Sequence, residues 1–153
     1  MERRIFSRFF ERILGENMEI YSMANRHKPE TGLTVNVWLD EAKEYVTGGH
    51  SKRMKFQINH ANDIQRENFA TLTFTGDVIV PNKMKRRYEL DSRDVKGVKN
   101  FMENNLYALD KLADELIYSS EFDKVMIKGG EPAEQGLKDE QKRKVDELLE
   151  GRR

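Results

Sequence analysis

A continuous stretch of helical periodicity limits most strongly what this chain can fold into. From Ser92 onward, apolar residues recur with the 3.6-residue period of an α-helix. They are Val95, Val98, Phe101, Met102, Leu106, Leu109, Leu112, Ala113, Leu116 and Ile117. With Asp91 or Ser92 as the N-cap, the pattern predicts one helix of about 26 residues, roughly 39 Å long. Such a helix buries its apolar face only against a second layer of structure.

The residues before this helix supply a sheet as that second layer. Apolar and polar residues alternate over 33–40, 54–59 and 70–75, which is the two-residue period of a β-strand. The first of these strands is expected to pack one face on the core and to leave the other partly solvated. Pro29 and Gly32 predict a turn before it. Shorter strands are expected at 18–25, 78–80, 85–90 and 122–128.

The order of these elements predicts an α+β fold. Residues 2–14 have two adjacent rows of apolar side chains at helical spacing, so an amphipathic N-terminal helix is expected there. The predicted fold is an antiparallel meander sheet of about five or six strands, with this N-terminal helix and the long helix packed on one face. Residues 1–130 would form this single α+β domain. Residues 131–153 are rich in charge and are expected to be a helical or frayed tail.

The composition excludes several classes of function. The chain has no cysteine, which rules out disulfides, thiolate nucleophiles and cysteine-ligated metals. Its 27 basic and 27 acidic residues balance, so no overall field attracts nucleic acid or anionic membrane. The chain has no run of about 18 apolar residues, so no transmembrane helix is expected. Charged residues interrupt the apolar residues at the N-terminus, whereas a secretory signal needs an uninterrupted apolar stretch. We expect a cytoplasmic protein of a bacterium or phage-infected cell, with no membrane partner.

Motifs for catalysis or metal binding are absent from the sequence. His27, His50 and His60 lie in predicted turns or loop edges, and no two of them have the spacing of ligands on one helix face. The glycines of 47–53 lack the spacing of a phosphate-binding loop. The sequence therefore predicts no catalytic, cofactor-binding or metal-binding residue, and no cofactor. An enzyme stays an alternative, to be favoured if converging loops place a histidine beside a carboxylate in a deep pocket.

Aromatic and basic residues are the candidates for contact with a partner. Phe9 and Phe10 lie on the apolar rows of the predicted N-terminal helix. This helix packs on the sheet, binds a partner or a second copy, or lies on a membrane surface, and Glu2 and Glu11 in its basic face disfavour the last of these. The basic candidates, which lie in three loops, are Arg26, His27, Lys28, Lys52, Arg53, Lys85, Arg86 and Arg87. Alternate connections of a meander fall at one end of the sheet, so some of these loops can adjoin in a positive ridge that suits an acidic protein or phosphates. The alternative is dispersed charge balanced by neighbouring acids.

Two segments, "RHKPETGLTVNVWLDE" and "VKNFMENNLYALDKLADELIYSSEFDKV", resemble a family of small bacterial proteins of unknown function. Members carry a His-x-Pro-Pro-His-Phe-His stretch before the first strand, then a sheet, then a helix with an Asn-x-x-x-Leu motif. His27 and Pro29 match the start of the first motif, although residues 32–34 are Gly-Leu-Thr in the region of its His-Phe-His. Asn105 and Leu109 match the second motif. The resemblance implies a bacterial accessory protein, in a family often suspected of toxin–antitoxin or mobile-element roles, and it transfers no catalytic residue.

These observations predict a non-enzymatic protein-binding or regulatory domain of a bacterial, phage or mobile-element accessory system. Its partner is expected to be another protein or a second copy of the chain. One alternative is a nucleic-acid-binding protein that uses the basic loops, whose affinity would fall steeply with salt. Another is a phage-encoded inhibitor of a host defence nuclease.

Overall fold

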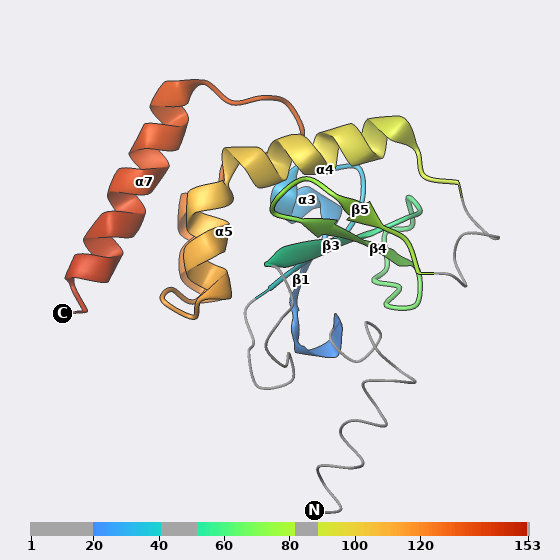
Figure 1. Ribbon diagram of the computed structural model, residues 1–153, viewed down its shortest axis with the longest axis horizontal. Coiled ribbons are helices and arrows are strands. Elements are labelled where there is room, and N and C mark those ends of the chain that lie inside the picture. Colours follow the sequence, from blue (N-terminus) through green and yellow to red (C-terminus); the bar gives the residue numbers. More distant parts are fainter. Residues whose placement is uncertain (1–19, 41–51, 82–88, 153) are drawn as a thin grey trace, which may run out of the picture.

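A five-stranded sheet lies at the centre of the protein, with helices packed over one of its faces (Figure 1). The computed structural model describes residues 20–40, 52–81 and 89–152. Its elements are the 3-10 helix η1 (Ile20–Ser22), β1 (Ala24–Arg26), α3 (Lys28–Thr31), β2 (Val37–Leu39), β3 (Arg53–Gln57), β4 (Phe69–Thr73), β5 (Val78–Ile79), α4 (Ser92–Asn104), α5 (Leu106–Ala113), α6 (Ser119–Val125) and α7 (Gln135–Glu150). Each strand pairs antiparallel with its neighbour in sequence. The predicted α+β meander is therefore confirmed.

The register of the central strands gives the sheet an apolar face. Leu39 lies opposite Met54, and Met54 lies opposite Leu72. These side chains join those of α4 and α5 in the main hydrophobic core, where Phe101 and Leu109 are also buried. Burial of each large apolar side chain stabilises the fold by about 1.5–3 kcal/mol. The apolar face of the sheet and the apolar faces of the helices therefore pack against each other, and the two sequence periods determine which residues lie on those faces.

The opposite face of the sheet is polar in part, yet it is also buried. Trp38 lies opposite Lys55, and Lys55 lies opposite Thr71. All three are fully buried, and Lys55 Nζ donates a hydrogen bond of 2.8 Å to Thr71 Oγ1 while lying 4.6 Å from the centroid of the Phe69 ring. The expectation of a partly solvated face on the strand at 33–40 is thus wrong at Trp38 and at Asn36, which is also fully buried.

The predicted single long helix is wrong, because the chain breaks into α4 and α5 at Asn105. This residue leaves helical geometry, with φ −111° and ψ 12°. Its side-chain Nδ2 donates to the Phe101 carbonyl (2.8 Å) and to the Ile127 carbonyl (2.9 Å), and its Oδ1 accepts from Gln141 Nε2 (2.7 Å). Asn105 is fully buried, so these bonds offset the cost of removing its amide from water. Apolar residues keep their helical spacing on both sides of Asn105, so the sequence pattern gives no sign of the break.

The two elements that follow α5, namely α6 and α7, are both helices. The strand expected at 122–128 is wrong, since Ser119–Val125 forms α6. Glu121 accepts a 2.8 Å hydrogen bond from the Tyr118 backbone N–H, a local bond that favours a helix N-terminus. Residues 131–153, expected as a tail, contain α7, whose Val145 is fully buried in the main core.

The chain before β2 also differs from its prediction in detail. The turn expected at Pro29 and Gly32 contains the short helix α3, which Gly32 ends with a left-handed φ of 76° and a 2.8 Å bond from its N–H to the Lys28 carbonyl. The predicted strand at 18–25 is largely replaced by η1, with β1 at its end. The predicted helix at 2–14 and most of the predicted strand at 85–90 lie outside the described residues.

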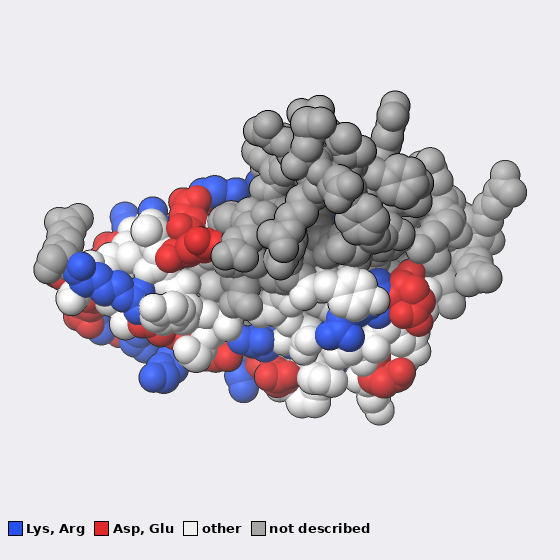
Figure 2. Space-filling model, turned by 90° about the horizontal axis from the view of Figure 1, so that it is seen from below, with Lys and Arg blue, Asp and Glu red and all other residues white. Residues whose placement is uncertain are grey.

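Acidic and basic side chains are interspersed on the part of the described surface that Figure 2 shows. In the view of Figure 2, Lys and Arg lie among Asp and Glu and do not form a region of one sign. Within the described ranges, no helix combines the length and the apolar character needed to cross a membrane.

Candidate functional site

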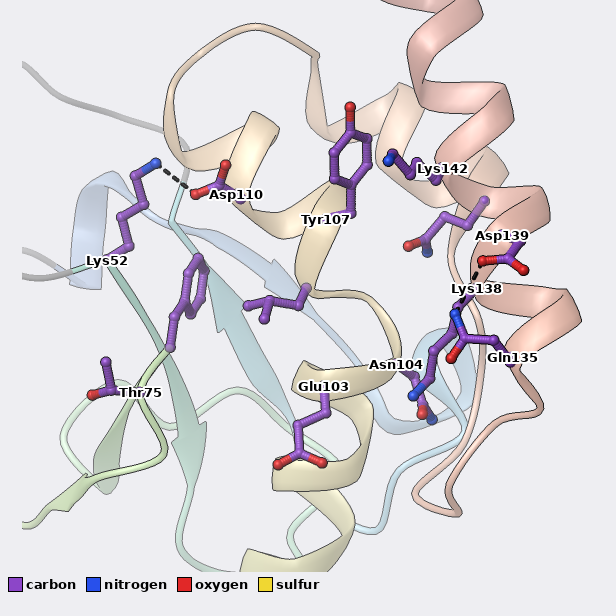
Figure 3. Close-up of a pocket in the computed structure, with 13 residues that line it drawn as sticks. Lys52, Thr75, Glu103, Asn104, Tyr107, Asp110, Gln135, Lys138, Asp139 and Lys142 are labelled. Carbon is purple, nitrogen blue, oxygen red and sulfur yellow. Dashed lines mark hydrogen bonds and ion pairs between the residues drawn. The ribbon is translucent and has the colours of Figure 1, made fainter.

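A groove with a volume of about 660 Å³ lies where α4, α5 and α7 meet the start of β3 and the end of β4 (Figure 3). Its apolar part consists of Phe74, Leu106 and the ring of Tyr107, and charged residues surround them. The charged residues are Lys52, Glu103, Asp110, Lys138, Asp139 and Lys142. A hollow with an apolar base and a polar rim is the form that most binding sites for ligands and peptides have.

The break at Asn105 is what leaves an apolar side chain in this groove. Leu106 is the first residue of α5 and is 38% exposed, although it belongs to the apolar stripe predicted for the long helix. Because α5 follows a new axis, its inward face starts with Ala108 and Leu109, which are fully buried or nearly so. Leu106 therefore remains available for contact with another molecule.

An ion-pair cluster fixes one end of the groove. Lys52 Nζ lies 2.6 Å from Asp110 Oδ1 and 2.8 Å from Asp114 Oδ2. The hydrogen bond that Lys52 donates to Asp110, followed by the one that it donates to Asp114, raises the pKa of Lys52 above its ordinary value. The start of β3 is in this way tied to α5, and Lys52 is not free to bind an anion.

Tyr107 connects α5 to α7 at the other side of the groove. Its hydroxyl donates a hydrogen bond to Asp146 Oδ1, and this bond, with a smaller effect of burial, raises the pKa of the phenol. Lys111 Nζ and Lys142 Nζ lie 5.0 Å and 5.4 Å from the centroid of its ring, within range of a cation–π interaction. Among the described residues, neither Lys142 nor its neighbour Lys138 forms an ion pair.

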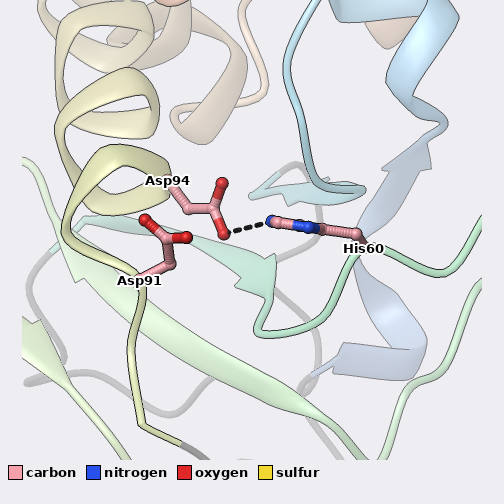
Figure 4. A group of neighbouring side chains, drawn as sticks. All are labelled: His60, Asp91 and Asp94. Atoms are coloured by element: carbon pink, nitrogen blue, oxygen red, sulfur yellow. Dashed lines mark hydrogen bonds and ion pairs between the residues drawn. The ribbon is translucent and has the colours of Figure 1, made fainter.

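A second cluster brings a histidine to two aspartates (Figure 4). His60 Nε2 lies 2.7 Å from Asp94 Oδ2, and Thr34 Oγ1 donates a 2.6 Å hydrogen bond to the other oxygen, Asp94 Oδ1. Asp91 caps α4 by accepting a 2.8 Å bond from the Arg93 backbone N–H, which confirms the N-cap prediction. His60, Asp91 and Asp94 each offer one ligand atom, and these three atoms lie within 4.8 Å of one another.

The loop that carries His60 is held by backbone carbonyls and amide side chains. Asn36 Nδ2 lies 3.3, 3.2 and 3.1 Å from the carbonyl oxygens of residues 61, 62 and 63. Gln57 Oε1 accepts from the backbone N–H of Gln65 at 2.8 Å, and Lys28 Nζ donates to the His60 carbonyl. His60 is therefore presented by an ordered loop, although its own side chain is 59% exposed.

A cleft of about 540 Å³ adjoins this cluster at Thr34. Arg93, Lys96 and Asn100 of α4 line it, together with glycines from the segments that precede β2 and α7. Gly130, which precedes α7, lies close to Gly97 of α4: a Cβ on Gly130 would lie 2.9 Å from Gly97 Cα. The cleft is thus formed by a backbone contact that side chains would prevent.

The sequence-predicted basic residues near β1 lie at one end of the sheet. Arg26 forms an ion pair of 2.8 Å with Asp123 of α6. His27 is exposed, with Nδ1 3.4 Å from the Asn62 carbonyl oxygen. Lys28 is the residue that donates to the His60 carbonyl, so the three candidates mostly stabilise neighbouring loops.

The basic residues near the start of β3 lie at the other end. Arg26 is opposite Val37, which is opposite Phe56, whereas Arg53 is opposite Thr73 at the far end of β3. Lys52 and Arg53 are therefore not brought together with the loop at 26–28. Arg53 is itself buried. The other candidates, Phe9, Phe10, Lys85, Arg86 and Arg87, lie outside the described residues, so the structure does not place them.

Sequence reasoning missed most of the groove. Leu106 was assigned to the buried stripe, and Lys138 and Lys142 to a solvated tail. His60 was recognised as a potential ligand, but its partners Asp91 and Asp94 are more than 30 residues away and no spacing rule links them. The comparisons with protein families, with curated proteins and with solved structures found no match. The candidate sites are consequently interpreted from their own chemistry.

Proposed function

We propose that this chain is a non-enzymatic protein-binding domain and that the groove between α5 and α7 binds a segment of its partner. The observation that carries the proposal is the exposed Leu106, which lines the groove together with Phe74 and Tyr107. Apolar side chains gathered in a hollow and surrounded by charge are typical of contact sites between proteins.

The charges of the groove favour an amphipathic segment with charges of both signs as its occupant. Lys138 and Lys142 line it from α7, Glu103 and Asp139 line it as well, and none of the four forms an ion pair among the described residues, whereas Asp110 is already paired with Lys52. An occupant with one or two large apolar side chains, flanked by an acidic and a basic residue, would cover Leu106 and complement the lysines and the acids. A volume of about 660 Å³ accommodates such side chains, not a whole folded domain.

The resemblance to small bacterial proteins supports placing this domain in the cytoplasm of a bacterium or phage-infected cell. There it would serve an accessory system of the toxin–antitoxin or mobile-element type. The partner would be a second protein, with a second copy of the chain as the simplest alternative.

The test compares a groove variant with a matched surface variant. Leu106→Asp introduces a charge at the base of the groove, and Leu116→Asp introduces the same charge at a residue that is 45% exposed and does not line it. Proteins captured by the tagged wild type from its native cells would be identified, and the purified pair measured by calorimetry. We expect Leu106→Asp to weaken binding by at least about 10-fold, a loss of about 1.4 kcal/mol, and Leu116→Asp to leave it unchanged.

Salt separates this function from nucleic-acid binding. A complex held by apolar contacts in the groove survives high salt, because salt does not weaken apolar burial. Nucleic acid that is captured at low salt, lost at high salt and insensitive to Leu106→Asp would contradict the proposal and favour a phosphate-binding surface.

A further inference from the structure

We propose that His60, Asp91 and Asp94 form a binding site for a divalent transition metal, with Zn²⁺ as the preferred ion. The proposal is independent of the groove, since none of the three residues lines it. It revises the sequence-based expectation of no metal-binding residue, because the sequence pattern could not identify Asp91 and Asp94 as neighbours of His60.

The ligand atoms are close enough to share one ion after small side-chain movements. Zn²⁺ binds imidazole nitrogen and carboxylate oxygen at about 2.0–2.2 Å, so two ligands of one ion lie roughly 3–4 Å apart. His60 Nε2 and Asp94 Oδ2 are 2.7 Å apart, the distance of a direct hydrogen bond, and the atom from Asp91 lies within 4.8 Å of both. Both His60 and Asp91 are exposed, so rotation of the imidazole can open the His60–Asp94 pair for an ion and rotation of Asp91 can bring its carboxylate closer.

The charge of the cluster favours a cation. The Asp94 side chain is only 7% exposed, and no Lys or Arg of the described residues forms an ion pair with Asp91 or Asp94. The side chains that hydrogen-bond to the Asp94 carboxylate among the described residues are those of His60 and Thr34, and the Thr34 hydroxyl carries no charge. A buried carboxylate without a counter-charge is costly, and a divalent ion coordinated by all three side chains would remove that cost.

The residues around the cluster orient its ligands. Thr34 Oγ1 holds Asp94 Oδ1 at 2.6 Å and leaves Oδ2 directed at His60, while the Asp91 carboxylate is fixed at the N-cap of α4. Such outer partners are a regular feature of metal sites. Lys28 holds the backbone of His60 through its carbonyl. Each ligand is thus presented by a different anchored backbone position.

The chemistry of the ligands selects the class of metal. One imidazole nitrogen with carboxylate oxygens suits Zn²⁺ and its neighbours in the first transition row, whereas Mg²⁺ and Ca²⁺ prefer oxygen ligands alone. Three protein ligands leave at least one coordination position of Zn²⁺ open. Because the His60 side chain is exposed, water or a side chain of a partner could fill that position.

The experiment measures Zn²⁺ binding to the purified full-length chain after removal of metals with a chelator. A titration against a chromophoric zinc indicator gives affinity and stoichiometry. We expect one Zn²⁺ per chain, bound roughly 100-fold or more tightly than Mg²⁺. His60→Ala should weaken Zn²⁺ binding by roughly 100-fold, since even outer partners of a zinc ligand contribute about 10- to 100-fold. Thr34→Val should weaken it by about 10-fold.

A matched histidine variant makes the result decisive. His27 is exposed at the same end of the sheet but outside the cluster, so His27→Ala should leave Zn²⁺ affinity unchanged. His60→Ala alters an exposed side chain and should retain the wild-type circular dichroism spectrum, and Asp94→Asn provides a nearly isosteric second test. Absence of Zn²⁺ binding, preference for Mg²⁺, or binding that persists in His60→Ala would each overturn the proposal.

Discussion

At the scale of single residues, the close contact between Gly97 and Gly130 restricts substitution at both positions. Asn100 Nδ2 donates a 2.9 Å hydrogen bond to the Gly130 carbonyl, which holds the segment before α7 against α4. A Cβ on Gly130 would lie 2.9 Å from Gly97 Cα, and backbone cannot give way as a flexible side chain does. We expect Gly130→Ala to lower the free energy of unfolding by about 1–3 kcal/mol, the usual cost of overpacking, as measured by urea denaturation.

A second glycine serves as the control for that variant. Gly136 lies in α7, and nothing lies within 4 Å of the position of its Cβ. Gly136→Ala should therefore raise stability by up to about 1 kcal/mol, because alanine favours a helix and restricts the unfolded chain. Equal effects of the two variants would show that backbone entropy, not the contact with Gly97, determines the result at Gly130.

At the scale of elements, α5 is connected to both the sheet and α7 through polar side chains. Tyr107 carries the connection to α7 through its bond to Asp146. We expect Tyr107→Phe to reduce stability by about 1 kcal/mol at neutral pH, the typical net value of one hydrogen bond, as measured by thermal and urea unfolding.

The pKa of Tyr107 gives this prediction a pH dependence. Because the folded state raises the pKa of the phenol, the stabilisation is fully present below the ordinary tyrosine pKa of about 10 and is lost as pH rises through the folded-state value. The difference between wild type and Tyr107→Phe should therefore shrink in alkaline solution. Tyr118→Phe, at a residue that is 71% exposed, is the control; an equal pH dependence there would contradict the role given to Tyr107.

The same elements show how far periodicity predicts structure. The alternation at 54–59 and 70–75 identified β3 and β4, because burial on a sheet face has a period of two residues. The break at Asn105 escaped prediction, since its cause is a set of hydrogen bonds to residues 22 and 36 positions later. The helix α6 was mistaken for a strand because seven residues are too few for a helical period to be distinguished.

At the scale of the whole molecule, both candidate sites arise from segments that are distant in sequence. The groove combines residues of α4, α5 and α7 with residues that precede β3 and follow β4, and the His60 cluster combines a loop after β3 with the first turn of α4. The sequence shows the chemical type of each residue, but it does not show which distant residues lie close together. That proximity depends on strand register and on the direction of α5. The basic loops show the opposite error. The sequence suggested that the loop at 26–28 and the loop before β3 could adjoin, but they lie at opposite ends of the sheet.

The placement of Val145 predicts that α7 unfolds together with the sheet. Its side chain is fully buried in the core shared by α4, α5 and the strands, and Gln141 one turn earlier binds Asn105. Val145→Ala should lower the free energy of unfolding by about 2 kcal/mol and should shift the transitions seen by far-ultraviolet circular dichroism and by Trp38 fluorescence equally. Leu137→Ala, on the same helix but 54% exposed, should change little. If Val145→Ala moved only the helical signal and left the Trp38 transition in place, α7 would be an independent segment, and a groove that depends on it would form only when a partner orders the helix.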